Sequence, residues 1–413
     1  MLTLTYEYKL KPTLKQIEII ENTLNVCRSV WNFALGHRKD WCKSRKSAIN
    51  VCSIEREYIM SVDEPFPNYH VQARLLTEAK KNNDFLKSAN AQVLQQTLRT
   101  LDRAWDNMKG RGFGFPRFKN KHRLKSFVFP QLNKDPISVD SIKLPGLKSV
   151  KWRMSRPIPD GFVPKQARIV RKASGYFVML SLQLDVKVPD SLPHGHPRGL
   201  DLGYDKFVAT SDGKEIKRPR FLKTLQYKLK LLSRRLRKKQ KGSNNRYKLN
   251  QKIARLHQKI ADTRKDWHFK LAHQLVQDAG MIFVEDLNFV SWQRGMLSKA
   301  SADAGFGQFV NILEWICWKT GTYFAKVNKD GTSQICPNCG VHTGKKSLDI
   351  RVHNCQQCGY TTTRDVAASQ EVRNRGVKAV GQIVSENVCG LDAAGSIGND
   401  ILVGTVRSRK PKS

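Results

Sequence analysis

Two short cysteine motifs constrain what this chain can fold into more than any other feature. Each has the pattern C-x-x-C, and the roughly 15-residue spacer between them is typical of a zinc site. Two such turns present four thiolates to one tetrahedral Zn²⁺, and a site closed by four sulfurs is structural rather than catalytic. Gly340 and Gly359 follow the motifs at positions that suit a left-handed backbone. We therefore predict a zinc ribbon over residues 331–362 whose ligands are Cys336, Cys339, Cys355 and Cys358.

Other possible ligands lie nearby, and the remaining cysteines need a different explanation. His342 and His353 fall inside the predicted ribbon and could substitute for a cysteine, although the spacing does not require it. Five cysteines lack the spacing of the two motifs, so we interpret them as core or surface thiols: Cys27, Cys42, Cys52, Cys317 and Cys389. The first residues show no charged-then-apolar leader pattern, so we expect a cytoplasmic protein whose cysteines stay reduced. No run of about 18 apolar residues exists, which argues against a membrane partner.

Charge is the strongest signal in the composition. The chain has 73 Lys and Arg residues against 35 Asp and Glu residues, which leaves a formal net charge of +38. Such a surplus repels itself in a compact protein and favours a polyanion as partner. Nucleic acid is therefore the expected partner class.

Residues 1–190 form a mixed α+β region by their patterning. Alternation predicts a first strand over residues 3–8, and helical spacing predicts helices over residues 14–37 and 89–108. Further strands are expected at residues 142–144, 167–170 and 176–180. Three prolines and a glycine within residues 188–197 indicate a linker, where we place a domain boundary.

Beyond the linker, strands and helices alternate. Residues 200–210 have strand character, and a turn is expected at residues 211–213. Recurring leucines and isoleucines predict a helical hairpin over residues 221–265. The later elements are expected at residues 281–285 (strand), 306–318 (helix), 322–327 (strand) and from 364 onward (helix), and we expect a poorly ordered tail over residues 388–413.

Two basic segments are candidate nucleic-acid contacts. The helical hairpin carries a dense basic face, which would contact a phosphate backbone or simply be solvated: Arg234, Arg235, Arg237, Lys238, Lys239 and Lys241. Between residues 112 and 121, glycines, aromatics and cations interleave, including Arg117 and Lys119. Its aromatic part, residues 113–118, would stack on bases or, equally, form a strand with phenylalanines in the core.

Three carboxylates occupy positions that favour metal binding. Asp201 lies in the middle of an apolar strand, where an unpaired carboxylate is costly, and Glu285 ends a second apolar strand. Asp365 stands at a helix start, where a lone acid is more often a helix N-terminal charge. Together they could hold two Mg²⁺ ions that act on a phosphodiester. Three other acids have plainer explanations as turn or loop residues: Asp205, Asp212 and Asp286.

These motifs resemble those of a known family. The order of residues 199–203 (GLDLG), 284–288 (VEDLN), 336–340 (CPNCG) and 364–368 (RDVAA) is similar to that in TnpB (OrfB) proteins of bacterial insertion sequences. Looser matches are residues 27–32, 116–119, 241–243 and 264–266, so the resemblance covers nearly the whole chain. TnpB proteins are RNA-guided DNA nucleases related to type V CRISPR effectors.

The resemblance implies a multidomain α/β and α+β architecture. Residues 1–190 would form a β-barrel with a helical insertion that holds a guide RNA derived from the transposon end. Residues 197–330 and 363–387 would form a RuvC-like domain of RNase H fold, interrupted by the zinc ribbon. Its catalytic acids would be Asp201, Glu285 and Asp365, acting with Mg²⁺ on double-stranded target DNA, with guide pairing supplying specificity. We expect a monomer or weak dimer.

Two residues depart from the family pattern, and two other functions remain open. Thr363 replaces an Asp and Ala367 an Asn that many members carry, and the second change could alter the support of Asp365. The main alternative to an endonuclease is a guided repressor or transposition accessory factor that binds DNA without cutting. A transposase that performs strand transfer itself is a further alternative, although no tyrosine-nucleophile pattern supports it.

Overall fold

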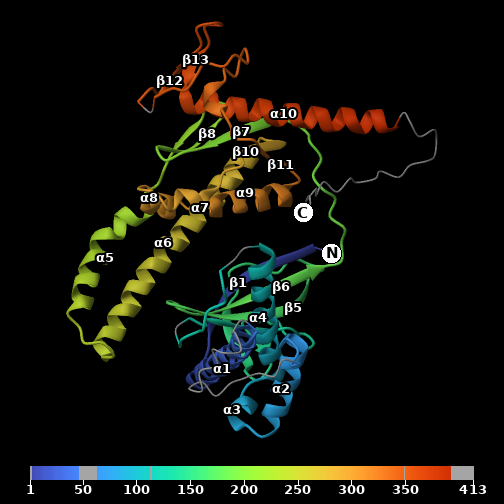
Figure 1. Cartoon of the computed structure of the whole chain (residues 1–413), viewed down its shortest axis with the longest axis vertical. Coiled ribbons are helices and arrows are strands. Elements are labelled where there is room, and N and C mark those ends of the chain that lie inside the picture. The colour runs from blue at the N-terminus through green and yellow to red at the C-terminus, as the bar shows by residue number, and fades with distance from the viewer. Residues whose placement is uncertain (1, 46–62, 112–113, 122, 348, 392–413) are drawn as a thin grey trace. The chain divides into compact units, whose positions relative to one another are not determined.

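The computed structural model describes residues 2–45, 63–111, 114–121, 123–347 and 349–391. They form two compact units, one ending at Val188 and the other beginning at Pro189 (Figure 1). The chain around this boundary, residues 185–196, contains neither helix nor strand. Among the described residues, none of the helices combines the length and the apolar character needed to cross a bilayer.

The first unit is built on a six-stranded antiparallel sheet with the order β2-β5-β6-β1-β4-β3. The strands are β1 (Leu2–Lys11), β2 (Ser126–Phe129), β3 (Ser141–Leu144), β4 (Lys148–Arg153), β5 (Val163–Lys172) and β6 (Gly175–Leu184). Val178, Leu180 and Leu182 alternate along β6 and are fully buried in its core. Within the described residues β2 and β3 remain edge strands, so the sheet is an open half-barrel. The expected β-barrel is therefore present as a half-barrel sheet.

The described part of the chain between β1 and β2 forms four helices. They are α1 (Leu14–Ser44), α2 (Tyr69–Lys81), α3 (Asp84–Lys87) and α4 (Ala91–Arg111). Thr13 and Gln16 form a capping box at the start of α1, since each side chain bonds the other's backbone N–H. The helix continues well beyond the predicted end at residue 37, whereas α4 lies within a few residues of its prediction.

The second unit contains a five-stranded mixed sheet with the order β11-β10-β7-β8-β9. Its strands are β7 (Pro197–Leu202), β8 (Lys206–Thr210), β9 (Glu215–Lys217), β10 (Met281–Glu285) and β11 (Tyr323–Val327). β11, β10 and β7 run parallel, whereas β7, β8 and β9 are antiparallel. The prediction of one strand over residues 200–210 is wrong, because the chain reverses after Leu202 and forms a hairpin that pairs Leu200 with Thr210.

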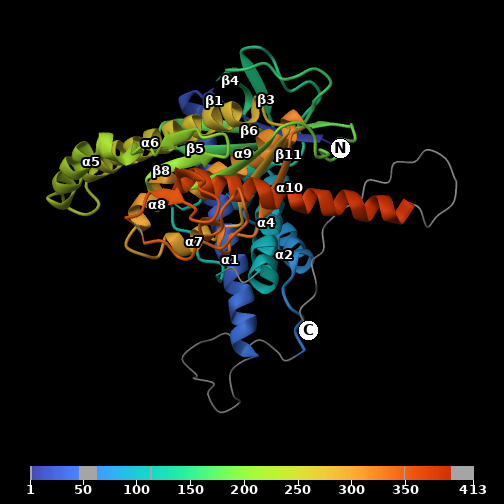
Figure 2. The ribbon, with the colours of Figure 1, turned by 90° about the horizontal axis from the view of Figure 1, so that it is seen from above.

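Helices cover both faces of this sheet. They are α5 (Phe221–Arg237), α6 (Asn244–Val276), α7 (Phe289–Trp292), α8 (Ser298–Ala304), α9 (Phe306–Thr320) and α10 (Arg364–Leu391). Helices α6 and α9 share one apolar core with the sheet, while α10 packs on the other face, where Val372 meets Phe283. Helices α5 and α6 lie side by side and extend away from the sheet of their unit (Figure 1, Figure 2).

The cysteine-containing segment is inserted between β11 and α10. It comprises a short 3-10 helix, η2 (Thr332–Gln334), and a hairpin of β12 (Val352–Asn354) and β13 (Thr361–Thr363) that leads directly into α10. The poorly ordered tail was predicted to begin at residue 388; this start is wrong, since α10 continues to Leu391. Residues 392–413 of that predicted tail lie outside the described residues.

Candidate functional site

Two of the predicted acids lie on the same face of the mixed sheet. Leu200 and Leu202 belong to the core beneath α6 and α9, so Asp201 between them points to the opposite face. Val284 belongs to the same core, so Glu285 also points to the opposite face. Because β7 and β10 are adjacent and parallel, and α10 covers this face, both carboxylates lie near that helix.

Helix α10 approaches the sheet closely because two glycines leave room for it. A Cβ at Gly199 in β7 would lie 2.0 Å from the backbone oxygen of Ser369 in α10. A Cβ at Gly376 in α10 would lie 2.2 Å from the ring of Phe283 in β10. Neither contact is possible for a larger residue without displacing the helix. This packing brings Asp365, in the first turn of α10, to the sheet.

Asp201 is the electrostatic centre of the three acids. Burial, and then the neighbouring carboxylates of Glu285 and Asp365, hold the pKa of Asp201 well above its usual range. Burial also raises the pKa of Glu285, although a hydrogen bond from Thr332 acts in the opposite direction. The pKa of Asp365 is raised first by burial and then by the nearby carboxylate of Glu215. Asp201 is thus the one of the three acids whose pKa is raised by both of the others.

The start of α10 is held by groups on β8 and β9. The Thr363 hydroxyl accepts a hydrogen bond from Val366 N at 3.4 Å and donates to Glu215 Oε1 at 2.7 Å. Glu215 Oε2 forms an ion pair with Lys206 Nζ at 2.7 Å. Thr363 thus caps the N-terminus of α10. Ala367 is buried in the same turn, where its methyl group gives Asp365 no hydrogen bond.

The carboxylates form an oxygen donor set that suits Mg²⁺. A buried carboxylate with a raised pKa is stabilised as an anion when a cation binds beside it. Within the described part of the chain, only the four cysteines form a group of three or more Cys, His, Asp or Glu ligands gathered within 4.8 Å. The three acids do not form such a group, so their carboxylate oxygens are not all within that distance of one another.

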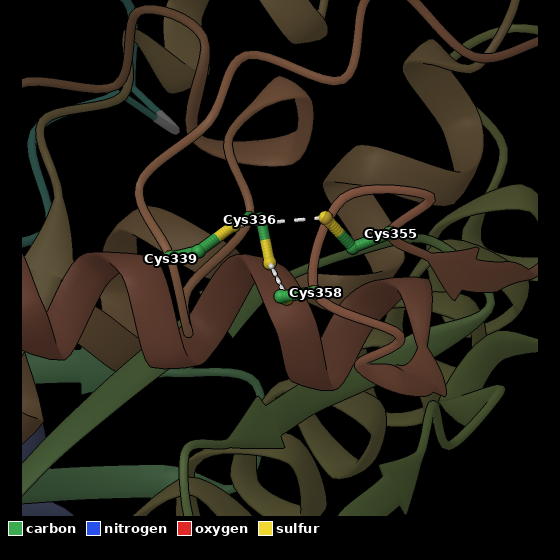
Figure 3. Close-up of side chains that lie close together, drawn as sticks. All are labelled: Cys336, Cys339, Cys355 and Cys358. Carbon is green, nitrogen blue, oxygen red and sulfur yellow. Dashed lines mark hydrogen bonds between the residues drawn. The ribbon is translucent and has the colours of Figure 1, made fainter.

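The four predicted cysteines do converge (Figure 3). Cys336 Sγ lies 3.7 Å from Cys358 Sγ, and Cys339 Sγ lies 3.6 Å from Cys355 Sγ. Zn–S bonds of about 2.3 Å in a tetrahedron require sulfurs about 3.8 Å apart, whereas a disulfide requires about 2 Å. The residues therefore fit a structural Zn²⁺.

The backbone of each cysteine turn follows one pattern. Gly340 N donates to Cys336 O and Gly359 N to Cys355 O, each at 2.9 Å. Both glycines have positive φ, 74° and 71°, as the sequence predicted. The amide of Asn338 donates to the Cys358 sulfur at 3.6 Å. This hydrogen bond, followed by one from the backbone of Tyr360 and by the neighbouring cysteines, lowers the pKa of the Cys358 thiol to about 6, which favours the thiolate that zinc binds.

Neither histidine of the ribbon joins the sulfur cluster. His353 is buried, and its Nδ1 contacts the Lys346 ammonium. His342 Nδ1 accepts a hydrogen bond from Gly344 N at 3.3 Å. The possibility that a histidine replaces a cysteine is therefore not realised in this structure.

The segment that carries Arg117 and Lys119 is an extended loop tied to α1. Trp31 Nε1 donates to Arg117 O at 3.1 Å, and Asn32 exchanges two hydrogen bonds with the backbone of Lys119 at 2.8 and 2.9 Å. Phe115 and Phe118 are 43% and 47% exposed. The strand alternative for this segment is therefore wrong, whereas Phe113 lies outside the described residues.

The basic face of the hairpin lies at its far end. Its six predicted cations are all exposed: Arg234, Arg235, Arg237, Lys238, Lys239 and Lys241. Arg246 closes the turn by donating to the backbone oxygens of Leu236 and Lys239 at 2.9 Å. The geometry leaves the cations accessible to a phosphate backbone and equally to solvent.

Family models match three parts of the chain. Residues 183–292 match OrfB_IS605, described as a probable transposase, and residues 306–372 match the Cas12f1-like TNB domain. Residues 1–47 match the OrfB_IS605 helix-turn-helix domain. Over the described residues of that last range the structure has one strand and one long helix, α1, so a helix-turn-helix is not formed there.

Similar proteins span nearly the whole chain. A "Putative RNA-guided DNA endonuclease" of Streptomyces pristinaespiralis is 28% identical, over 91% of this chain and 89% of the relative. A second, InsQ of Escherichia coli K12, with the same description, is 29% identical over 92% and 94%. The solved mini-RNA-guided endonuclease CRISPR-Cas_phi3 covers 92% of both chains at 10% identity, with a TM-score of 0.44, too loose a likeness to place residues. On the family matches and the two relatives, this chain is a TnpB-like protein.

Proposed function

We propose that this chain is an RNA-guided DNA endonuclease that cuts with Mg²⁺ at Asp201, Glu285 and Asp365. The observation that carries the proposal is the position of Asp201, a carboxylate on a buried strand between two other acids that raise its pKa. A group so placed is costly without a cation, and such perturbed acids mark functional sites. The two relatives that span the chain are described as RNA-guided DNA endonucleases, which supports the same activity.

The three acids would hold Mg²⁺ in this proposal. Asp201, whose pKa both other acids raise, would be a ligand together with Glu285 and Asp365. Mg²⁺ bound there would supply an activated water and stabilise the leaving oxygen of the phosphodiester. The mixed sheet carries Asp201 and Glu285, and α10, which follows the cysteine segment, carries Asp365. This arrangement supports a RuvC-like domain over residues 197–330 and 363–387. The zinc ribbon over residues 331–362 would have a structural role.

The basic surfaces would hold the nucleic acids. We assign guide RNA from the transposon end to residues 1–190, where Arg117 and Lys119 lie on a loop of the first unit. The exposed cations of the α5–α6 hairpin would contact the backbone of the guide–target duplex. Double-stranded target DNA would be selected by guide pairing. We propose a monomer or weak dimer in the cytoplasm, where the thiols stay reduced.

The test is plasmid cleavage by protein co-expressed with its native flanking DNA, so that guide RNA copurifies. Mg²⁺-dependent cutting beside a defined flank is expected, with loss of cutting in Asp201→Ala and Glu285→Gln. The matched control is Asp286→Asn, which changes the neighbouring exposed acid and should leave cutting intact. Tight target binding without cutting by the wild type would refute the endonuclease and support a guided repressor or accessory factor. Ala367→Asn would then be the first substitution to test for a gain of cutting.

A further inference from the structure

A short segment between β11 and the first cysteine turn lies against the carboxylate of Glu285. Thr332, in η2, donates its hydroxyl to Glu285 Oε1 at 2.5 Å, and both side chains are buried. The same hydroxyl lies 3.3 Å from Lys329 O, but it has a single proton. The shorter contact, to a carboxylate, is the stronger hydrogen bond. Neither acid motif nor cysteine motif includes Thr332.

Contacts on both sides fix this segment in place. At its start, Arg375 of α10 donates to two backbone carbonyls, those of Asn328 and Asp330, at 2.8 Å each. At its end, Thr343 N, from beyond the first cysteine turn, donates to Gln334 O at 2.7 Å. The hydroxyl of Thr332 is thus held between α10 and the ribbon.

We propose that Thr332 is a positioning residue for Glu285, through which the zinc ribbon orients the carboxylate toward the catalytic cation. The proposal rests on the proposed nuclease function. The terminal torsion of a glutamate is broad, so an unrestrained Glu285 would sample many orientations. With Oε1 held by Thr332, Oε2 accepts no hydrogen bond from the described residues and remains available to a metal ion.

Hydrogen bonds from neighbouring residues to metal ligands have known consequences. They fix ligand orientation, and their loss typically lowers metal affinity or activity by about 10–100-fold. Thr332→Val removes the hydroxyl and keeps the shape, whereas Thr332→Ser keeps the hydroxyl. Thr343→Val is the matched control, because the Thr343 hydroxyl bonds Gln334 O at 3.0 Å in the same segment without contacting Glu285.

The experiment uses the protein–guide RNA complex with two readouts. The first is the cleavage rate as a function of Mg²⁺ concentration. The second replaces Mg²⁺ by Fe²⁺, adds hydrogen peroxide and ascorbate to generate hydroxyl radicals at the bound iron, and maps scission of the polypeptide near β10, which reports metal occupancy without DNA cleavage. Thr332→Val should need about 10–100-fold more of either ion. Thr332→Ser and Thr343→Val should behave as the wild type, and target binding should not change.

The experiment distinguishes failure of the proposed role of Thr332 from failure of the proposed active site. Wild-type metal dependence of Thr332→Val, while Asp201→Ala is inactive, overturns the role of Thr332 and leaves the nuclease intact. A rate that falls equally at every Mg²⁺ concentration, in Thr332→Ser as well as Thr332→Val, assigns Thr332 a purely structural role and overturns the proposal too. Full cutting by Asp201→Ala instead refutes the proposed active site itself.

Discussion

Gly199→Ala tests whether the close approach of α10 to the sheet places the third acid. Gly199 lies in β7, two residues before Asp201, and its Cα faces the backbone of α10. The added methyl group would lie 2.0 Å from Ser369 O and 2.5 Å from Arg373 N. Both atoms belong to the helix backbone, so no side-chain rotation can relieve the contact.

The size of the effect follows from these distances. Ordinary contact begins at about 3.4 Å, so α10 must move by more than 1 Å relative to β7. Overpacking of this kind costs about 1–3 kcal/mol, which lowers the melting temperature of a unit of this size by several degrees. A 1 Å misplacement of a catalytic group costs about 100-fold in rate. We expect both losses in Gly199→Ala, because Asp365 moves with the helix.

The assay combines thermal unfolding of the protein with single-turnover cleavage by its guide RNA complex. Gly376→Ala should be destabilised in the same way, since its Cβ would overlap the buried ring of Phe283. Gly381→Ala, in the same helix but with open space around it, should be neutral or stabilised by up to about 1 kcal/mol. Wild-type stability and cleavage in Gly199→Ala would show that this contact does not position Asp365.

Three further predictions concern other parts of the chain. Cys355→Ser should lose the bound zinc measured by elemental analysis, whereas Cys42→Ser, outside the cluster, should retain it; zinc retained in both would refute the four-sulfur site. Burial lowers the pKa of His268 to about 4, so as the pH falls this histidine is protonated in the unfolded chain before it is protonated in the folded chain. The free energy of unfolding should therefore fall by roughly 3 kcal/mol from pH 6.5 to pH 4, and chemical denaturation should show a smaller fall in His268→Gln. A further variant replaces four hairpin cations by Gln: Arg234, Arg235, Lys238 and Lys239. The slope of log binding constant against log salt concentration for duplex binding should become shallower by about 0.9 for each phosphate that the hairpin no longer neutralises. An unchanged slope would mean that this face is only solvated.

Local patterns made the metal-binding candidates predictable. The cysteine turns are set by residues three apart and by a following glycine, so their geometry follows from short-range sequence. An acid inside an apolar strand, such as Asp201, is conspicuous for the same reason. The β7–β8 reversal had a signal that the prediction of one strand did not use, because Gly203 and Asp205 are turn-forming residues between two apolar runs.

Interactions between distant segments were not predictable. Thr332 is 47 residues from Glu285, and Thr363 is 148 residues from Glu215. A hydroxyl residue in a loop carries no local signal of its acceptor, since threonines are common in loops for other reasons. The close approach at Gly199 is only partly visible in sequence, because a glycine within a strand suggests a bulge or a close backbone approach but not which segment approaches.

The place of the cysteine segment in the chain links it to the acids. It begins after β11, the neighbour of the strand that ends on Glu285, and it returns the chain at Arg364, one residue before Asp365. Arg364 N donates to Arg351 O at 2.8 Å, and Asn374 of α10 donates to Pro337 O, within the first cysteine turn, at 2.7 Å. The four sulfurs therefore close a loop that supports a carboxylate at each end. Thr332 at its start holds Glu285, and Thr363 at its end caps the helix that carries Asp365. The ribbon thus acts on the acids through its ends rather than through its cysteines, and an unfolded ribbon would release both the segment that carries Thr332 and the start of α10.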